Sequence, residues 1–307
     1  MRDWKNSLKG VLTGGLTGIA LGLGGFWLAE IPATHAMGWV MFFLVPLGAG
    51  FAITMVTQEP NRASAAAILA TIVSLVVLVA SGLETFLCVL LLFPLLLGAL
   101  AAGIALGLLF CKLSGKVGDK NVTFTSVILL SIPLIVLAGH RAEISTLVHP
   151  RREIVTSTIH LDAKPSEVWT ALRTFDSVTG AKPFLMYVGL PIPVRCSMQG
   201  NGLGAKRTCY FDKGYIEETV TEWMPPNVMG LSIDRTNLPG RHWLNFEDAR
   251  YELNREGGET VLTRTTTITS NLYPAWYWRP FERWGVTSEH QYIFGDLALR
   301  FSHIVSQ

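Results

Sequence analysis

Residues 154–172 read IVTSTIHLDAKPSEVWTAL, and the periodicity of the sequence changes in the middle of this stretch. Up to Leu161 apolar and polar residues alternate, which predicts a β-strand. The Pro-Ser-Glu at 165–167 predicts the start of a helix, because proline suits the first turn and an acidic residue there favours the helix dipole. The residues expected on the buried side of this helix are Val168, Trp169 and Leu172.

The rest of the C-terminal half predicts one sheet and one long helix. Short stretches bounded by turn residues predict strands at 194–198, 205–211, 215–223, 228–234, 245–254 and 260–270. A helix is predicted from about 275 to 304, with an apolar face made of Phe281, Trp284, Ile293, Phe294, Leu297 and Phe301. This order of elements predicts an α+β helix-grip fold, in which a curved antiparallel sheet wraps around the long C-terminal helix and leaves a cavity.

The N-terminal half has a different composition. Charged residues are scarce between Leu8 and Ala138, whereas from Arg151 onward they are spread throughout. The change predicts two domains, an N-terminal α-helical transmembrane bundle at 1–140 and a water-soluble domain at 150–307. About five segments are long and apolar enough to cross a membrane, namely 8–28, 37–57, 63–80, 86–110 and 122–138. A cleaved signal peptide is the alternative for the first segment, but its apolar run is too long for a typical signal.

Lysine and arginine in the short loops predict the orientation in the membrane. They occur at the N-terminus and in alternate loops, as Arg2, Lys5, Lys9, Arg62, Lys112, Lys116 and Lys120. We therefore expect an integral protein of the bacterial inner membrane with a cytoplasmic N-terminus. Five crossings place the soluble domain on the outer, periplasmic side. If the fifth segment does not span, the soluble domain is cytoplasmic instead.

Several classes of function are not favoured by the composition. The formal net charge is only +2, so no basic field indicates a nucleic-acid partner. The four cysteines have no metal-like spacing, and no nucleotide-binding or hydrolase motif is present, so we expect no metal and no cofactor.

Glu84 is the only acidic residue near a span, and polar residues at mid-depth, which a transporter needs, are lacking. Small residues at a spacing near four, such as Gly14 and Gly18, predict close helix packing.

The stretch from Ile159 to Trp169 resembles the opening of the START-like SRPBCC superfamily, often labelled polyketide cyclase/dehydrase. Stretches that resemble a membrane-attached branch of it are 202–209, 222–226, 274–279, 41–47 and 82–88. The wider superfamily binds lipids, sterols, polyketides and other hydrophobic molecules in its cavity, and a minority of its members are enzymes. The resemblance therefore implies a hydrophobic ligand, while the activity of the membrane-attached branch is not settled.

Strand alternation places Ala205, Arg207, Cys209 and Phe211 on one face of their strand, and Ile216, Glu218 and Val220 on one face of the next. The resemblance implies that these faces line the cavity. Arg207 and Glu218 would then be an inward charge pair that either holds two strands together or anchors a ligand head group. The residues predicted to line the cavity are Phe184, Arg207, Cys209, Phe211, Glu218 and Trp276.

Two cysteines are predicted to lie opposite each other. If Gly202 and Leu203 form a two-residue turn, Cys196 faces Cys209 within reach of a disulfide. The alternatives are a disulfide, which an oxidising outer compartment favours, and two buried free thiols. A cysteine nucleophile needs a nearby base. The sequence alone cannot place the candidate bases His160, His242 and His290 beside Cys209.

Three functions follow from these patterns. The first is a membrane-anchored module that binds a lipid or another hydrophobic small molecule. The second is a cyclase, dehydratase or hydrolase, for which the candidate acid-base groups are Glu218, Asp248 and His290. The third is an assembly role with a protein partner. The aromatic residues Trp276, Tyr277, Trp278, Phe281 and Trp284 fit a core, a membrane-interface belt or a gate to the cavity.

Overall fold

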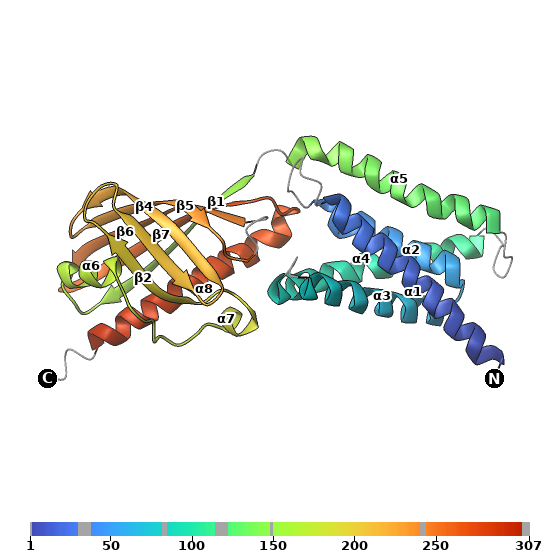
Figure 1. The fold of residues 1–307 in the computed structure, drawn as a ribbon, viewed down its shortest axis with the longest axis horizontal. Helices are drawn as coiled ribbons and strands as arrows, with labels where there is room; N and C mark the ends of the chain where they lie inside the picture. Colours follow the sequence, from blue (N-terminus) through green and yellow to red (C-terminus); the bar gives the residue numbers. More distant parts are fainter. Residues whose placement is uncertain are drawn as a thin grey trace. The chain divides into compact units, whose positions relative to one another are not determined.

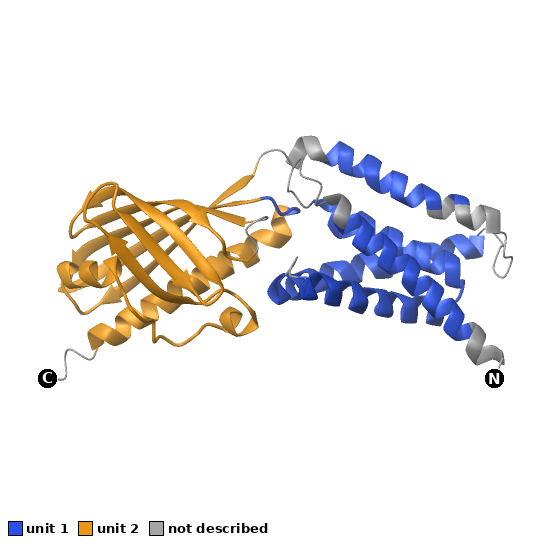
Figure 2. Ribbon diagram, viewed as in Figure 1, with its two compact units in different colours: residues 1–149, 271–274 blue, residues 150–270, 275–307 orange. Residues whose placement is uncertain are grey.

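The computed structural model describes residues 2–29, 38–81, 85–113, 122–147, 150–239 and 244–302. The chain forms two compact units, which Figure 2 shows in blue and orange. One contains residues 1–149 and 271–274, and the other contains residues 150–270 and 275–307. Glu84 and His242, which the sequence analysis singled out, lie outside the described residues.

The first unit is helical (Figure 1). Its elements are α1 (Arg2–Ala29), the π-helical turn η1 (Val40–Leu44), α2 (Val45–Thr57), α3 (Pro60–Ala80), α4 (Phe86–Leu113) and α5 (Val122–Leu147). Within the described part of the chain, three stretches are long and apolar enough to cross a membrane: Val40–Thr57, Pro60–Ala80 and Phe86–Leu113. The predicted count of about five spans is therefore not supported. The two remaining helices carry charged residues at one end, at positions 2, 3, 5 and 9 of α1 and at 141 and 143 of α5.

Glycines allow the backbones of these helices to approach closely. A Cβ added to Gly103 of α4 would lie 2.1 Å from the carbonyl oxygen of Leu47 in α2. On α1, a Cβ at Gly18 would lie 2.8 Å from the side chain of Ile53. Gly98, in contrast, has no described residue within 4 Å of its Cβ position. Close approach at small residues is the usual way in which membrane helices associate.

We expect the Gly103→Ala variant of the full chain to be less stable by about 1–3 kcal/mol, because its methyl group forces α2 and α4 apart. The Gly98→Ala variant is the matched control, since it adds the same methyl group to the same helix in open space. The measurement is the midpoint of denaturation by increasing SDS in mixed micelles. Equal midpoints for the two variants would show that the α2–α4 contact is not tight.

The second unit contains a seven-stranded antiparallel sheet in the order β1-β7-β6-β5-β4-β3-β2. The strands are β1 (Arg151–Leu161), β2 (Pro193–Gln199), β3 (Lys206–Phe211), β4 (Gly214–Met224), β5 (Val228–Thr236), β6 (Leu244–Glu256) and β7 (Glu259–Ser270). The helices are α6 (Pro165–Arg173), α7 (Phe184–Val188) and α8 (Ala275–Ser302). Register shifts in β2, β4 and β6 bend the sheet, because each inserts a residue into one strand of a pair. The long helix α8 runs along one face of the sheet (Figure 1), which is the predicted helix-grip arrangement.

The main core of this unit lies between the sheet, α6 and the C-terminal half of α8. Val168, Trp169 and Leu172 of α6 are buried there, as predicted. Ile293, Phe294, Leu297 and Phe301 of α8 are buried in the same cluster, also as predicted. The short helix α7 was not predicted, because its five residues follow a proline and are too few for a helical period to be recognised.

The N-terminal half of α8 differs from the prediction. Trp284, expected on the buried face, is exposed, while the polar residues Glu282 and His290 are buried. Both have hydrogen-bond partners from the sheet: Ser270 donates to Glu282, and Thr266 lies 2.9 Å from the His290 ring. An apolar pattern alone misplaces this face of the helix, because polar side chains that find partners are buried as readily as apolar ones.

Candidate functional site

The candidate site begins on the inward faces of β3 and β4. Ala205, at the start of β3, and Arg207 and Cys209 within it are buried, while Lys206 between them is exposed. On β4 the buried residues are Ile216, Glu218 and Val220. The alternation predicted for both strands is therefore confirmed. Phe211, at the end of β3, is only partly buried against the main core.

Arg207 and Glu218 form a buried ion pair across these strands. Their closest atoms, Nη1 and Oε2, are 2.7 Å apart, and their side chains are only 3% and 7% exposed. A second guanidinium nitrogen of Arg207 donates to the carbonyl oxygen of Leu172 at the end of α6. Burial alone would lower the pKa of Arg207, but the charge and hydrogen bond of Glu218 together with the effect of Tyr251 outweigh it. The pKa is raised overall, so the guanidinium remains charged.

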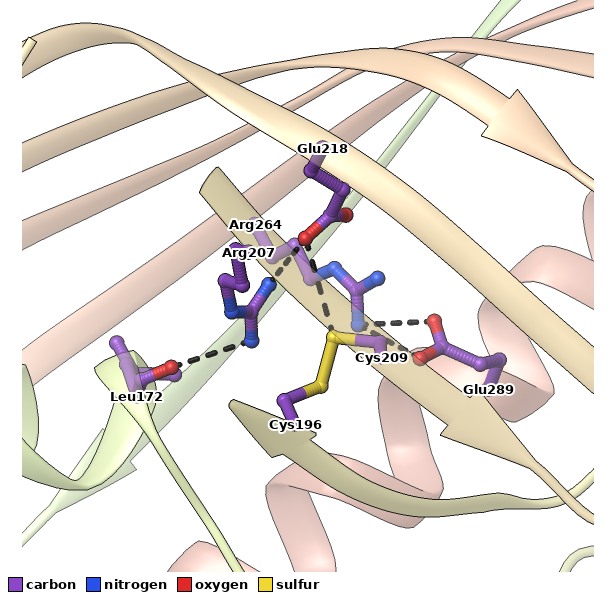
Figure 3. The surroundings of a disulfide bond; sticks show 7 residues. All are labelled: Leu172, Cys196, Arg207, Cys209, Glu218, Arg264 and Glu289. Atoms are coloured by element: carbon purple, nitrogen blue, oxygen red, sulfur yellow. Dashed lines mark hydrogen bonds and ion pairs between the residues drawn. A yellow bond between two sulfur atoms is a disulfide. The ribbon is translucent and has the colours of Figure 1, made fainter. Parts of the chain in front are cut away.

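A second pair lies beside the first. Arg264 of β7 contacts Glu289 of α8, with Nη1 and Oε2 2.8 Å apart. The guanidinium carbons of Arg207 and Arg264 lie 5.9 and 5.3 Å from the centre of the Tyr251 ring, in the range of cation–π contacts. Figure 3 shows the two guanidinium groups between Leu172 and Glu289. Sequence reasoning missed Arg264, Glu289 and Tyr251, because they come from three elements far from β3 in the chain.

A disulfide bond joins Cys196 of β2 to Cys209 of β3 next to this cluster (Figure 3). The two cysteines are directly paired in the ladder, with Cα atoms 4.1 Å apart. The predicted two-residue turn is wrong, since the strands are connected by residues 200–205, with positive φ at three glycines. The register is nevertheless the predicted one, because the longer connection and the predicted turn are both centred between Gly202 and Leu203. The Cys209 sulfur lies 3.8 Å from Oε2 of Glu218.

The other proposed acid-base groups are not part of this cluster. Asp248 is partly exposed and contacts the exposed Arg152 at 3.4 Å. His160 is exposed and lies 3.4 Å from Glu259. His290 is fully buried between Ser157 and Thr266, each 2.9 Å from one of its ring nitrogens. Burial, and secondly the charge of Arg264, lower the pKa of His290 to about 2.

We expect His290 to make the protein acid-sensitive. Its pKa is about 2 in the folded protein and 6.5 in the unfolded chain, so below pH 6.5 only the unfolded chain takes up this proton. Above pH 6.5 His290 does not change the free energy of unfolding. Below pH 6.5 it lowers the free energy of unfolding by about 1.4 kcal/mol for each pH unit.

Urea unfolding at about pH 7.5 and pH 5, compared with the His290→Gln variant, measures this contribution. The fall in unfolding free energy is expected to be about 2 kcal/mol smaller in the variant. The expectation is wrong if both proteins lose the same stability between the two pH values.

Two predicted cavity residues lie on the surface instead. The structure places Phe184 and Trp276 at 64% and 65% exposure, so neither belongs to the buried cluster. Phe184 stacks on Trp284, with ring centroids 6.3 Å apart, and Tyr187 of the same short helix is also exposed. Both aromatic side chains were expected to enter a cavity because apolar residues are normally buried. At these positions the backbone of α7 and α8 directs the side chains outward.

A polar network missed by sequence reasoning connects the start of β1 to the start of α8. Arg151 contacts Glu153 and Glu282, each at 2.7 Å, and Arg279 contacts Glu153 at 2.6 Å. Burial alone would raise the pKa of Glu153, but hydrogen bonds from the two arginines lower it overall. A spacing of four between Glu282, Val286 and His290 is the signal by which this helix face could have been recognised.

The arrangement supports binding better than catalysis. Glu218 is already paired with an arginine, and His290 remains neutral with both ring nitrogens occupied. A general base should have a pKa near the working pH and a free position toward its substrate. In the described part of the chain, no three histidine, cysteine or acidic side chains come together in a way that could hold a metal ion.

The solved structures that are similar to this protein cover about half of the chain. No protein-family model matches the chain, and no curated protein matches it. Solved structures similar to it include a protein from Nitrosospira multiformis, with 18% identity and a TM-score of 0.33, covering 50% of this chain and 100% of that one. Another is a START superfamily protein from Mycobacterium smegmatis, with 10% identity and a TM-score of 0.36, covering 49% and 98%. The Aha1 dimer from Colwellia psychrerythraea has 16% identity and a TM-score of 0.29, covering 48% and 98%. Membership of the membrane-attached branch stays a prediction, and the helix-grip assignment rests on the strand order and on α8.

Proposed function

We propose that this protein is a membrane-anchored module that holds a lipid or another hydrophobic small molecule between the sheet and α8. One observation carries the proposal: Arg207 is buried among apolar core residues, and its Nε has no hydrogen-bond partner among the described residues. A buried unsatisfied donor costs about 1–3 kcal/mol. A ligand with an apolar body and one polar group would remove this cost.

The affinity of such a ligand would come mainly from its apolar surface. Burial contributes roughly 25 cal/mol for each Å² removed from water. The core cluster of this unit is apolar, and its members include Val220, Leu231 and Leu262. A hydrogen bond between Arg207 and the polar group of the ligand would fix the orientation of the ligand. Small-molecule sites commonly have apolar walls and a few such polar contacts.

Exposed aromatic residues support an exchange of the ligand with the bilayer. Phe184, Tyr187, Trp276 and Trp284 are all exposed, and aromatic side chains favour the interface between membrane and water. Helix α5 ends at Leu147 and β1 begins at Arg151, a connection that spans at most about 14 Å. An α5 embedded in the membrane would therefore keep the domain near the bilayer.

We place the domain on the outer side of a bacterial inner membrane, with a cytoplasmic N-terminus. This orientation requires α1 and α5 to cross the membrane together with the three apolar stretches, and the basic residues of the short loops then all lie on the cytoplasmic side. The disulfide between Cys196 and Cys209 supports it too, because disulfides persist in oxidising compartments. Accessibility of the C-terminus to an impermeant reagent in spheroplasts tests the orientation. Labelling only after lysis would contradict it.

The function is tested by native mass spectrometry and lipid extraction of the full chain in nanodiscs. We expect a bound hydrophobic molecule in the wild type and its loss in Val220→Trp, which places a large side chain on the buried face of β4. The matched control is Glu217→Trp, which adds the same side chain to the partly exposed face of the same strand. Circular dichroism verifies that both variants fold. The proposal fails if no bound molecule is found and the protein takes up no lipid from the nanodisc.

A further inference from the structure

The charges of the cluster balance. It contains two guanidinium groups, from Arg207 and Arg264, and two carboxylates, from Glu218 and Glu289. The Arg207–Glu218 pair is buried, and the Arg264–Glu289 pair is partly buried. The nearby His290 adds no charge, because its buried ring is neutral. A ligand that carries a full negative charge would therefore meet no net positive charge, and it would have to lie close to two carboxylates.

Two hydrogen-bond donors of the cluster lack an acceptor among the described residues. The Nε atoms of both Arg207 and Arg264 are buried and have no partner among the described residues. Both guanidinium groups lie over the ring of Tyr251, so the two arginines share one neighbourhood (Figure 3). An arginine has only donors, and each unpartnered N–H requires an acceptor oxygen or nitrogen.

From these two facts we infer that the ligand of this site presents a neutral hydrogen-bond acceptor, such as an ester, ketone or amide carbonyl, to Arg207 and Arg264. This inference rests on the proposed function and narrows its ligand class. A carbonyl oxygen accepts the spare hydrogen bonds without bringing a charge into the apolar interior, where an unpaired charge is costly. A pure hydrocarbon leaves both donors unpartnered, and a carboxylate or phosphate adds a negative charge that the cluster does not neutralise.

The test compares three ligands of the same chain length on the full chain in detergent micelles: hexadecane, palmitate at alkaline pH, and methyl palmitate. Dissociation constants are corrected for partition into empty micelles. We expect methyl palmitate to bind about tenfold more tightly than either of the other two. The preference should fall to about threefold or less in Arg207→Lys and Arg264→Lys, which keep the positive charge but remove the Nε–H group.

The control is Arg152→Lys, since Arg152 is exposed on the other side of the sheet and its pairs with Glu247 and Asp248 are exposed too. It should keep the full ester preference. Equal binding of the three ligands, or strongest binding of palmitate, would overturn the inference and leave the proposed function standing. If none of the three binds and no other lipid is found, the proposed function itself fails. A lost preference in the Arg152 control would overturn the assignment to the buried arginines.

Discussion

Replacement of Glu218 by leucine is expected to lower the free energy of unfolding by about 3–5 kcal/mol. The change leaves Arg207 charged and buried, with its closest counter-ion removed. Among the described residues, the guanidinium would keep its hydrogen bond to the carbonyl of Leu172 and its contact with the Tyr251 ring. The measurement is thermal or urea unfolding of the full chain, followed by the fluorescence of the tryptophans in the soluble domain.

Two further variants separate charge burial from loss of packing. The double variant Arg207→Met/Glu218→Leu removes both charges, and we expect it to recover most of the lost stability, because a buried pair is often replaceable by apolar residues. Glu247→Leu removes one partner of the exposed Arg152 and should cost less than about 1 kcal/mol. If the double variant is as unstable as Glu218→Leu alone, the loss comes from packing and the charge argument is wrong.

The double variant also bears on function. A structural role of the pair predicts that a stable apolar replacement still binds the hydrophobic ligand with unchanged affinity. An anchoring role predicts a stable protein that has lost ligand affinity, because the N–H donors of Arg207 are gone. Stability and binding of the same variant therefore decide between the two roles that the strand pattern alone leaves open.

Removal of the disulfide is expected to cost about 3 kcal/mol, because it closes a loop between cysteines 13 residues apart. The variant is Cys196→Ala/Cys209→Ala. Wild-type protein in a strong reductant should show a similar loss. The double variant itself should not respond to the reductant. In unfolded, unreduced wild type we expect only Cys88 and Cys111, the two cysteines outside this disulfide, to react with a thiol reagent. Reaction of all four before reduction would show that the bond is absent.

Much of the soluble domain is predictable from local patterns. The alternation in β3 and β4 places Arg207 and Glu218 on one face, since successive side chains of a strand point to opposite faces. The register of Cys196 against Cys209 is also local, because a short connection determines which residues pair. Helix α6 is recognisable from its proline and acidic start together with an apolar stripe.

In the first unit the apolar helices are predictable, but the number that is long and apolar enough to cross a membrane is not. A run of apolar residues is sufficient to indicate a span, and three of the five expected spans are supported. The contact surfaces are less predictable. Gly98 and Gly103 lie on the same helix, yet only Gly103 meets the backbone of α2. The composition of a helix does not predict which of its faces packs against a neighbouring helix.

The sequence by itself determined the division into two halves, the strands and the longer helices, and the neighbouring pairs within one hairpin. These features depend on hydrophobic periods and turn residues over a few positions. Only the tertiary structure decided that Arg264, Glu289 and Tyr251 join Arg207, and that Glu282 and His290 are buried while Phe184 and Trp276 are not. The physical reason is that a polar side chain can be buried only where partners meet it, and here those partners come from strands and helices distant in the chain.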